Sequence, residues 1–178
     1  MAAILDNIKK GKLPAKVTVV ISNNPDAKGL EIAKTYGIET VVCSPKDFSS
    51  KEIYEEEIVK ILRKRKVELV VLAGYMRILG EGFIEAYQNK IINIHPSLLP
   101  AFKGLHAQRQ ALEYGVKVAG CTVHFVDNTL DGGRIILQDV VPVLDNDTDV
   151  TLSKRILEKE HVIYTQAIQK LIDHNLKL

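Results

Sequence analysis

Cysteine is scarce in this sequence, and long apolar runs are absent from it. The two cysteines, Cys43 and Cys121, lie far apart and without ligand-like spacing, which argues against a disulfide framework and against a zinc site. We therefore expect a protein of the reducing cytoplasm. The apolar run in MAAILDNIKKGK is too short for a signal peptide, and no segment approaches the ~20 apolar residues that cross a bilayer, so we expect a soluble protein with no membrane partner.

The sequence also lacks an excess of charge of one sign. A formal net charge of +2 gives no general affinity for polyanions, so nucleic acid is not an expected partner. The five histidines lack the spacing of metal ligands, which disfavours a metal-assisted hydrolase, and we expect no metal. There is no internal repeat or linker, and 178 residues suit a single domain over 1–178, as a monomer or a homodimer.

Short apolar runs alternate with helical patterns along most of the chain. Helical spacing of apolar residues is found at 2–10, 30–37, 50–66, 80–88, 106–115 and about 151–173. Apolar or β-branched runs typical of strands are found at 16–22, 39–44, 67–74, 91–95, 118–126 and 134–143. This order predicts an α/β fold, Rossmann-like, with three layers (α/β/α) and a mainly parallel sheet that has an antiparallel C-terminal portion.

The stretch IINIHPSLLP (91–100) places two polar residues within a β-like run. Asn93 and His95 are two positions apart, so in a strand they project together, while Ile92 and Ile94 face the other side. Pro96 cannot donate to a β-ladder and should end the strand there. A histidine at a strand end is more often structural, but in parallel α/β sheets this end is also where ligands bind.

Two other segments run from an apolar strand into polar or turn residues, LAGYMRIL (72–79) and HFVDNTLDGG (124–133). If these strands are neighbours of 91–95 in a parallel sheet, their ends converge on one cleft. The loop with Asp127, Asn128 and Asp131 is either an ordinary connection or a source of a carboxylate beside His95, which would favour the charged imidazole.

The chemistry of these groups indicates direct acyl or formyl transfer. The amide of Asn93 can donate to a carbonyl oxygen on which negative charge develops. Ser97 is too close to His95 along one strand end to act as a nucleophile paired with a base, and no G-x-S-x-G sequence is present. A covalent acyl-enzyme is therefore not expected.

Four motifs in this order resemble those of the glycinamide ribonucleotide formyltransferases, folate-dependent enzymes of purine synthesis. They are LAGYMRIL, NIHPSLLP, GCTVHFVDNTLDGGRIILQ (120–138) and EKEHVIY (158–164), and the resemblance extends from about residue 3 to the C-terminus. It implies the formyltransferase fold and transfer of a formyl group from 10-formyltetrahydrofolate, a co-substrate, to the amine of glycinamide ribonucleotide. Asn93, His95 and Asp131 match the catalytic residues of this family.

The resemblance also implies binding residues for the two small-molecule substrates. The folate would contact Asn93 and a set made of Lys51, Met76, Arg77, Ile78, Leu79, Asp127, Asn128, Thr129, Leu130 and Asp131. The ribonucleotide would contact Leu157, Glu158, Lys159 and Glu160, of which Glu160 matches an acid that holds the ribose hydroxyls. From the sequence alone, Lys51 would be a solvated lysine at a helix start and Glu160 a surface helix residue. Thr165 stands where the family often has proline.

Two relatives share the catalytic trio but differ elsewhere. Formyltetrahydrofolate deformylase usually has an N-terminal regulatory domain and a histidine at the position of Pro96, and methionyl-tRNA formyltransferase has a C-terminal RNA-binding domain. Pro96 favours the transferase. The alternatives are a folate-binding protein without transferase activity and a deformylase-like hydrolase.

The N-terminus departs from the family pattern. Family members begin with an apolar strand and a G-x-G-S-N loop that binds phosphate at a helix start, whereas AAILDNI matches the helix itself. Loss of an internal strand would leave two strand edges unpaired. We expect that roughly a dozen residues with this loop precede Met1. The alternative is a short protein that folds but binds the ribonucleotide poorly.

Overall fold

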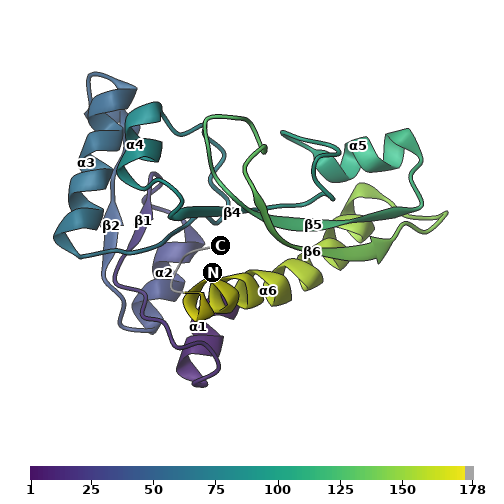
Figure 1. The fold of residues 1–178 in the computed structure, drawn as a ribbon, viewed down its shortest axis with the longest axis horizontal. Coiled ribbons are helices and arrows are strands. Elements are labelled where there is room, and N and C mark those ends of the chain that lie inside the picture. The colour runs from purple at the N-terminus through teal and green to yellow at the C-terminus, as the bar shows by residue number, and fades with distance from the viewer. Residues whose placement is uncertain (175–178) are drawn as a thin grey trace.

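The computed structural model describes residues 1–174, and its strands form two sheets (Figure 1). In the first sheet β1 (Val20–Ser22) and β2 (Thr40–Val42) are parallel. The second sheet has the order β3 (Val70–Val71), β4 (Ile91–His95), β5 (Val118–Phe125) and β6 (Ile135–Pro142). β3 and β4 are parallel, whereas β5 is antiparallel to both of its neighbours. The predicted mixed sheet is confirmed, and its antiparallel portion includes the β4–β5 pair.

The helices lie where the apolar spacing predicted them. They are α1 (Ala2–Lys9), α2 (Lys28–Thr35), α3 (Lys51–Lys64), α4 (Glu81–Ala86), α5 (Ala107–Tyr114) and α6 (Asp149–Asp173), with a short 3-10 helix at Pro45–Asp47. Side-chain caps begin two of the α-helices, α3 and α6, because the hydroxyls of Ser50 and Thr148 accept hydrogen bonds from the backbone N–H groups of Ile53 and Thr151. Gly115, at φ 81°, ends α5 in the left-handed region.

Several strands are shorter than the apolar runs that predicted them. The run 16–22 contributes only three ladder residues, and the run 67–74 only two. Within residues 1–174, β1 pairs only with β2, and β3 pairs only with β4. The other residues of these two runs lie outside the ladder, so the apolar run overestimates the length of the strand.

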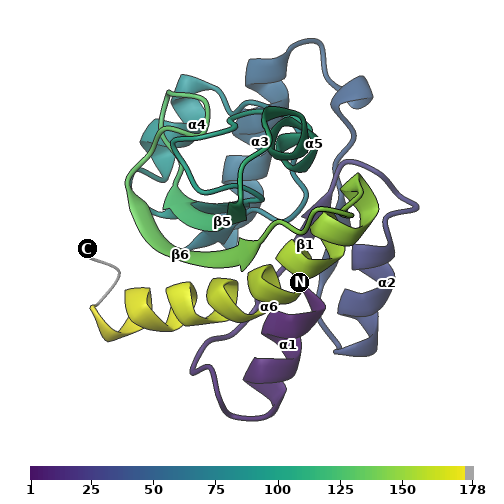
Figure 2. The ribbon, with the colours of Figure 1, turned by 90° about the vertical axis from the view of Figure 1, so that its right-hand side faces the viewer.

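The second sheet, β3 to β6, lies between two layers of helices (Figure 2). In that view α1 and α6 are on one side of β5 and β6, and α3 and α4 are on the other, while α5 contacts α6. Adjacent residues of β4 belong to different cores, because Ile91 packs with α3 and α4 while Ile92 packs with α1 and α6. Both isoleucines are fully buried, as successive residues of a strand covered on both faces should be. The three-layer α/β/α arrangement is therefore confirmed.

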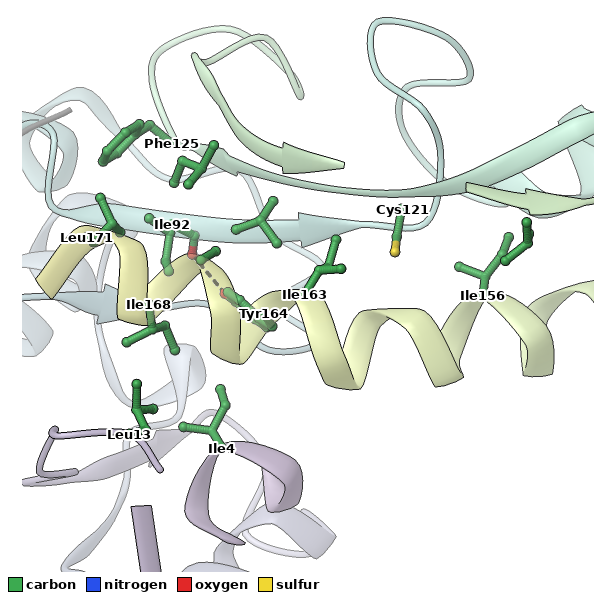
Figure 3. Packing of buried hydrophobic residues seen from close by; sticks show 14 of the residues in the cluster. Ile4, Leu13, Ile92, Cys121, Phe125, Ile156, Ile163, Tyr164, Ile168 and Leu171 are labelled. Atoms are coloured by element: carbon green, nitrogen blue, oxygen red, sulfur yellow. Dashed lines mark hydrogen bonds between the residues drawn. The ribbon is translucent and has the colours of Figure 1, made fainter. Parts of the chain in front are cut away.

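Tyr164 attaches the long helix α6 to the strands beneath it (Figure 3). Its buried hydroxyl donates its hydrogen to the carbonyl oxygen of Leu72 at 2.5 Å and is 3.1 Å from the carbonyl oxygen of Ile92. Leu72 directly follows β3, and Ile92 is the second residue of β4. The hydroxyl thus satisfies backbone acceptors between helix and sheet.

The start of α6 depends on an ion pair that acid should weaken. Asp147 accepts from both terminal nitrogens of Arg155, at 2.7 and 2.9 Å, and from the backbone N–H of Leu144. Arg155, followed by the Leu144 N–H, lowers the pKa of Asp147 well below its usual range. A carboxyl group with a lowered folded pKa stabilises the fold above its unfolded pKa of about 3.9, and this contribution is lost as the pH falls toward the folded value.

We therefore expect Asp147→Asn to lower Tm by a few degrees at pH 7, with the difference from the unmodified chain shrinking below about pH 4. Thermal unfolding followed by circular dichroism between pH 3 and 8 measures this. Asp145→Asn is the matched control, because the Asp145 side chain is 96% exposed and its pair with Lys117 should contribute little. A difference that stayed constant down to pH 3 would contradict the assignment.

Candidate active site

His95 and Asp131 lie in direct contact although they come from separate parts of the chain. His95 is the last residue of β4 and is 6% exposed, and its Nδ1 is 3.4 Å from Oδ2 of Asp131. Asp131 adopts the left-handed region at φ 45°, and its Oδ2 also accepts from the backbone N–H of Gly104 at 2.8 Å. The hypothesis of a trio made of Asn93, His95 and Asp131 required this carboxylate to lie beside the imidazole, and in the structure it does.

The second ring nitrogen of His95 faces a backbone acceptor. Nε2 is 2.9 Å from the carbonyl oxygen of Phe102, and because a carbonyl only accepts, this nitrogen carries a hydrogen. The carboxylate of Asp131 lies on the Nδ1 side. A ring with a proton on each nitrogen can therefore donate to both neighbours, so the site accommodates an imidazolium.

Asn93 is placed by the pairing of β4 with β5. It stands directly across from His124 in the antiparallel ladder, and its Nδ2 is 3.4 Å from Nε2 of His124. The Nδ1 of His124 donates to the carbonyl oxygen of Phe125 at 2.8 Å. Burial is the main cause that lowers the pKa of His124, so this ring is neutral at pH 7. The amide and the imidazole pair across two strands.

The expectation that parallel strand ends meet in one cleft is only half right. β3 and β4 are parallel, but β5 is antiparallel to β4, so the carboxyl end of β5 lies beside the start of β4. The loop 126–134 then returns to bring Asp131 to His95 at the other end of β4. Gly133 permits this path, because a Cβ there would lie 1.9 Å from the carbonyl oxygen of Phe125.

A buried hydroxyl holds the segment that follows His95. Thr122, on β5 and fully buried, donates to the carbonyl oxygen of Ser97 at 2.7 Å. Its oxygen accepts from the backbone N–H of Leu99 at 3.0 Å and from the side-chain amide of Gln138 at 2.9 Å. The chain beyond β4 is thus fixed to β5 and β6.

The residues predicted to contact folate fall into two groups. Met76, Ile78 and Leu130 are large apolar side chains that are 77%, 68% and 55% exposed. Arg77 lies over the ring of Tyr54 on α3, with its guanidinium carbon 5.8 Å from the ring centroid. The exposed apolar side chains come from the two loops that the sequence identified, after β3 and after β5.

Other members of that set are engaged elsewhere. The side chain of Leu79 is buried in the core with α3 and α4, so only its backbone is available to a ligand. The ammonium of Lys51 is 3.7 Å from Glu55, a buried carboxylate that also accepts from the N–H of Gly80 at the start of α4. Asp127 accepts from the N–H of Thr129 in its own loop, and Asn128 is exposed.

The predicted ribonucleotide residues divide in a similar way. Leu157 and Glu160 line a cavity of about 370 Å³ together with Ala73, Gly74 and Ile94. Burial raises the pKa of Glu160. The cavity lies on the α6 side of β4 and reaches the chain that follows β3.

Lys159 and Glu158 are not among the residues that line this cavity. Lys159 instead forms an ion pair with Asp139 on β6 at 3.2 Å, and Glu158 is exposed. Glu160 is therefore the carboxylate of the predicted set that faces the cavity.

The sequence interpretation missed two polar residues of β5. Thr122 and His124 alternate with apolar residues in a strand that is otherwise buried, which is the pattern that singled out Asn93 and His95. The alternation alone could have identified Thr122 and His124 from the sequence. The residues that these two side chains contact, however, follow only from the β4–β5 register.

Two kinds of feature are absent from residues 1–174. No group of three or more histidine, cysteine, aspartate or glutamate side chains there could hold a metal ion. Within the same residues, no helix combines the length and the apolar character needed to cross a membrane. Cys43 and Cys121 are free and buried.

Comparison with known proteins assigns the class. Residues 1–168 match the formyl transferase family, and the chain belongs to this family. It is 43% identical over 178 residues to the phosphoribosylglycinamide formyltransferase of Escherichia coli (strain K12), covering all of this chain and 84% of the relative. The glycinamide ribonucleotide transformylase 1 of Symbiobacterium toebii has a similar fold, with a TM-score of 0.93 and 51% identity over 94% of this chain and 79% of that one. Within the family, the chain belongs with the phosphoribosylglycinamide formyltransferases.

A longer relative contains the same region. The trifunctional purine biosynthetic protein adenosine-3 of Drosophila melanogaster is 46% identical over 159 residues, which are 89% of this chain. The chain spans only 12% of that protein's length. The match therefore covers one part of a much longer polypeptide.

Proposed function

We propose that this chain transfers a formyl group from 10-formyltetrahydrofolate to the amino group of glycinamide ribonucleotide, giving formylglycinamide ribonucleotide in de novo purine synthesis. The observation that carries the proposal is the contact of His95 with Asp131, beside Asn93, in a member of this family. The names of the most similar full-length relatives favour transfer over a folate-binding protein or a deformylase-like hydrolase. The chain acts in this proposal as one formyltransferase domain.

The proposed reaction is a direct displacement at the formyl carbon. The amine attacks this carbon, the bond from carbon to the folate nitrogen breaks, and a proton passes from the amine to that nitrogen, through an ordered water. Asn93 and protonated His95 donate to the oxygen as it becomes negative, and Asp131 holds the imidazolium. The Nε2–H of His95 reaches this oxygen once the oxygen replaces the carbonyl of Phe102.

Exposed apolar side chains support the folate site. A flat pterin needs apolar contacts with a few convergent polar groups. Met76, Ile78 and Leu130 each expose more than half of their surface, and all three belong to the loops that adjoin the proposed catalytic groups. We assign the loops 76–79 and 127–131 to folate binding. Lys51 contributes less in this proposal, because its ammonium already forms an ion pair with Glu55.

The acceptor is assigned to the cavity beside α6. Glu160 is the carboxylate of the predicted set that faces it, and a carboxylate accepts hydrogen bonds from vicinal ribose hydroxyls. The side chain of Asn93 projects from the face of β4 opposite to the face that α6 and Glu160 cover. A substrate held by Glu160 would therefore have to extend past β3 to reach the formyl group. Ala73 and Gly74 line that path.

The test is an assay of the purified chain with both substrates. We expect formylglycinamide ribonucleotide and tetrahydrofolate to form in equal amounts, detected by mass spectrometry and by the absorbance change of the folate. Free formate without formylated product would identify a hydrolase instead. Folate binding with no reaction would identify a binding protein.

Two variants on α6 refine this assay. Glu160→Ala should raise KM for the ribonucleotide at least about tenfold, because a charge-assisted hydrogen bond is lost, and should leave KM for the folate unchanged. Glu158→Ala is the matched control, since this side chain is exposed and outside the cavity. Equal effects of the two substitutions would refute the assigned role of Glu160.

A further inference from the structure

His124 is buried behind the catalytic residues, and the roles assigned above do not include it. It is 2% exposed, and one of its ring nitrogens faces both the amide of Asn93 and the carboxylate of Asp131. Its Nε2 is 3.4 Å from Asn93 Nδ2 and 3.9 Å from Asp131 Oδ1. A buried imidazole in contact with two members of the trio needs a physical explanation.

The backbone determines which nitrogen of this ring carries the hydrogen. The carbonyl oxygen of Phe125 lies 2.8 Å from Nδ1 and can only accept, so Nδ1 is the protonated nitrogen. Burial, the largest effect on the pKa of His124, lowers it, and the charge of His95 lowers it further, whereas the Phe125 carbonyl, Asp131 and Asp127 raise it. The net direction leaves a neutral ring with an unprotonated Nε2.

An unprotonated Nε2 is an acceptor, and this decides the orientation of the Asn93 amide. An amide that turned its oxygen toward Nε2 would place two lone pairs against each other. The amide must therefore present Nδ2, and one Nδ2 hydrogen is donated to His124. The second hydrogen of the same nitrogen remains available on the side away from His124.

We infer that His124 is a positioning residue for formyl transfer, which fixes the Asn93 amide so that its free N–H faces the formyl oxygen. The inference rests on the proposed function for its catalytic consequence. His124 itself does not touch the reacting atoms. It acts through Asn93, because a reversed amide would direct a carbonyl oxygen at a developing oxyanion.

The competing arrangement is an ion pair between His124 and Asp131. It would need a proton on Nε2, and the 3.9 Å separation is longer than a hydrogen bond. Asp131 Oδ2 already accepts from Gly104 and faces His95 at 3.4 Å. Because a neutral His124 does not form an ion pair with Asp131, the carboxylate of Asp131 remains available to pair with His95.

The kinetic test is a double-mutant cycle. His124→Leu removes the acceptor but leaves the Asn93 amide in place. We therefore expect kcat to fall about ten- to a hundredfold, less than the ~10²–10³ expected when an oxyanion donor is lost outright, while KM for the folate changes little. His124→Gln offers an oxygen acceptor near the former Nε2 and should restore most of kcat. In the Asn93→Ala background, His124→Leu should change kcat by less than about twofold, because its target is gone.

A merely structural role gives a different pattern. His124→Leu would then lower kcat by the same factor with and without Asn93, and His124→Gln would not restore it. Either result overturns the inference. If the unmodified chain transfers no formyl group, the proposed function fails, and the ring itself still provides a test.

That test is the tautomer, read by nitrogen NMR of the unmodified chain. Nδ1 of His124 should be protonated and Nε2 unprotonated at pH 7, and the side-chain amide signals of Asn93 should move in His124→Leu more than those of the exposed Asn128. A protonated Nε2 at pH 7 overturns the inference whether or not the chain is active.

Discussion

Replacing His95 by alanine should lower kcat for formyl transfer by about 10³-fold or more. The substitution removes a proton-bearing group beside the reacting carbonyl and leaves the charge of Asp131 without its partner, and each of these effects alone is worth ~10²-fold or more. KM for the folate should stay within about threefold, because the exposed apolar residues assigned to its binding lie on other loops. Steady-state kinetics with the folate varied measures both quantities.

The control for this prediction is His174→Ala. His174 follows α6, is exposed, and should have no effect on kcat. Circular dichroism must show that both variants are folded. A rate for His95→Ala near that of the unmodified chain would refute the role of the imidazole, even if the contact with Asp131 is intact.

Thr122→Val should destabilise the fold by about 2–4 kcal/mol. The two side chains have nearly the same shape, so the change tests the hydroxyl and not the packing. Loss of the hydroxyl leaves the carbonyl of Ser97 and the N–H of Leu99 without this partner in a site that water does not reach. Each buried backbone group left unsatisfied costs ~1–3 kcal/mol. Urea denaturation, followed by circular dichroism, gives the difference in the free energy of unfolding.

Thr122→Ser separates the hydroxyl from the methyl group. It keeps all three hydrogen bonds and removes one buried methyl, which costs about 1 kcal/mol. If Val and Ser cost the same, the network contributes nothing beyond packing. Because the segment held by Thr122 directly follows His95, the valine variant should also have a lower kcat than the serine variant.

The fold was predictable because local patterns and the global arrangement agree. The strands lie within apolar or β-branched runs, and the longer helices have apolar residues at helical spacing, so the order of the elements could be predicted from the sequence. The direction of β5 did not follow. Nothing local to residues 118–125 distinguishes a strand that runs parallel to β4 from one that runs antiparallel, since the connection through α5 could serve either.

The trio of Asn93, His95 and Asp131 could be proposed from the sequence, but its surroundings could not. Asn93 and His95 share a face because strand residues alternate, and that inference needs no partner. His124 and Thr122 acquire their roles only from the β4–β5 register. The pair of Lys51 with Glu55 could have been inferred from their i,i+4 spacing in the predicted helix, whereas the contact of Glu55 with the N–H of Gly80 needed the structure.

Tyr164 has a mechanical consequence for the two substrates. Glu160 lies one helical turn before Tyr164 on α6, and the Tyr164 hydroxyl contacts the backbone carbonyl of Ile92, next to Asn93. The helix that carries Glu160 and the strand that carries Asn93 are therefore tied together through one hydroxyl. In the proposed reaction this attachment controls how far the amine lies from the formyl carbon, so a displacement of α6 relative to β4 should slow the transfer.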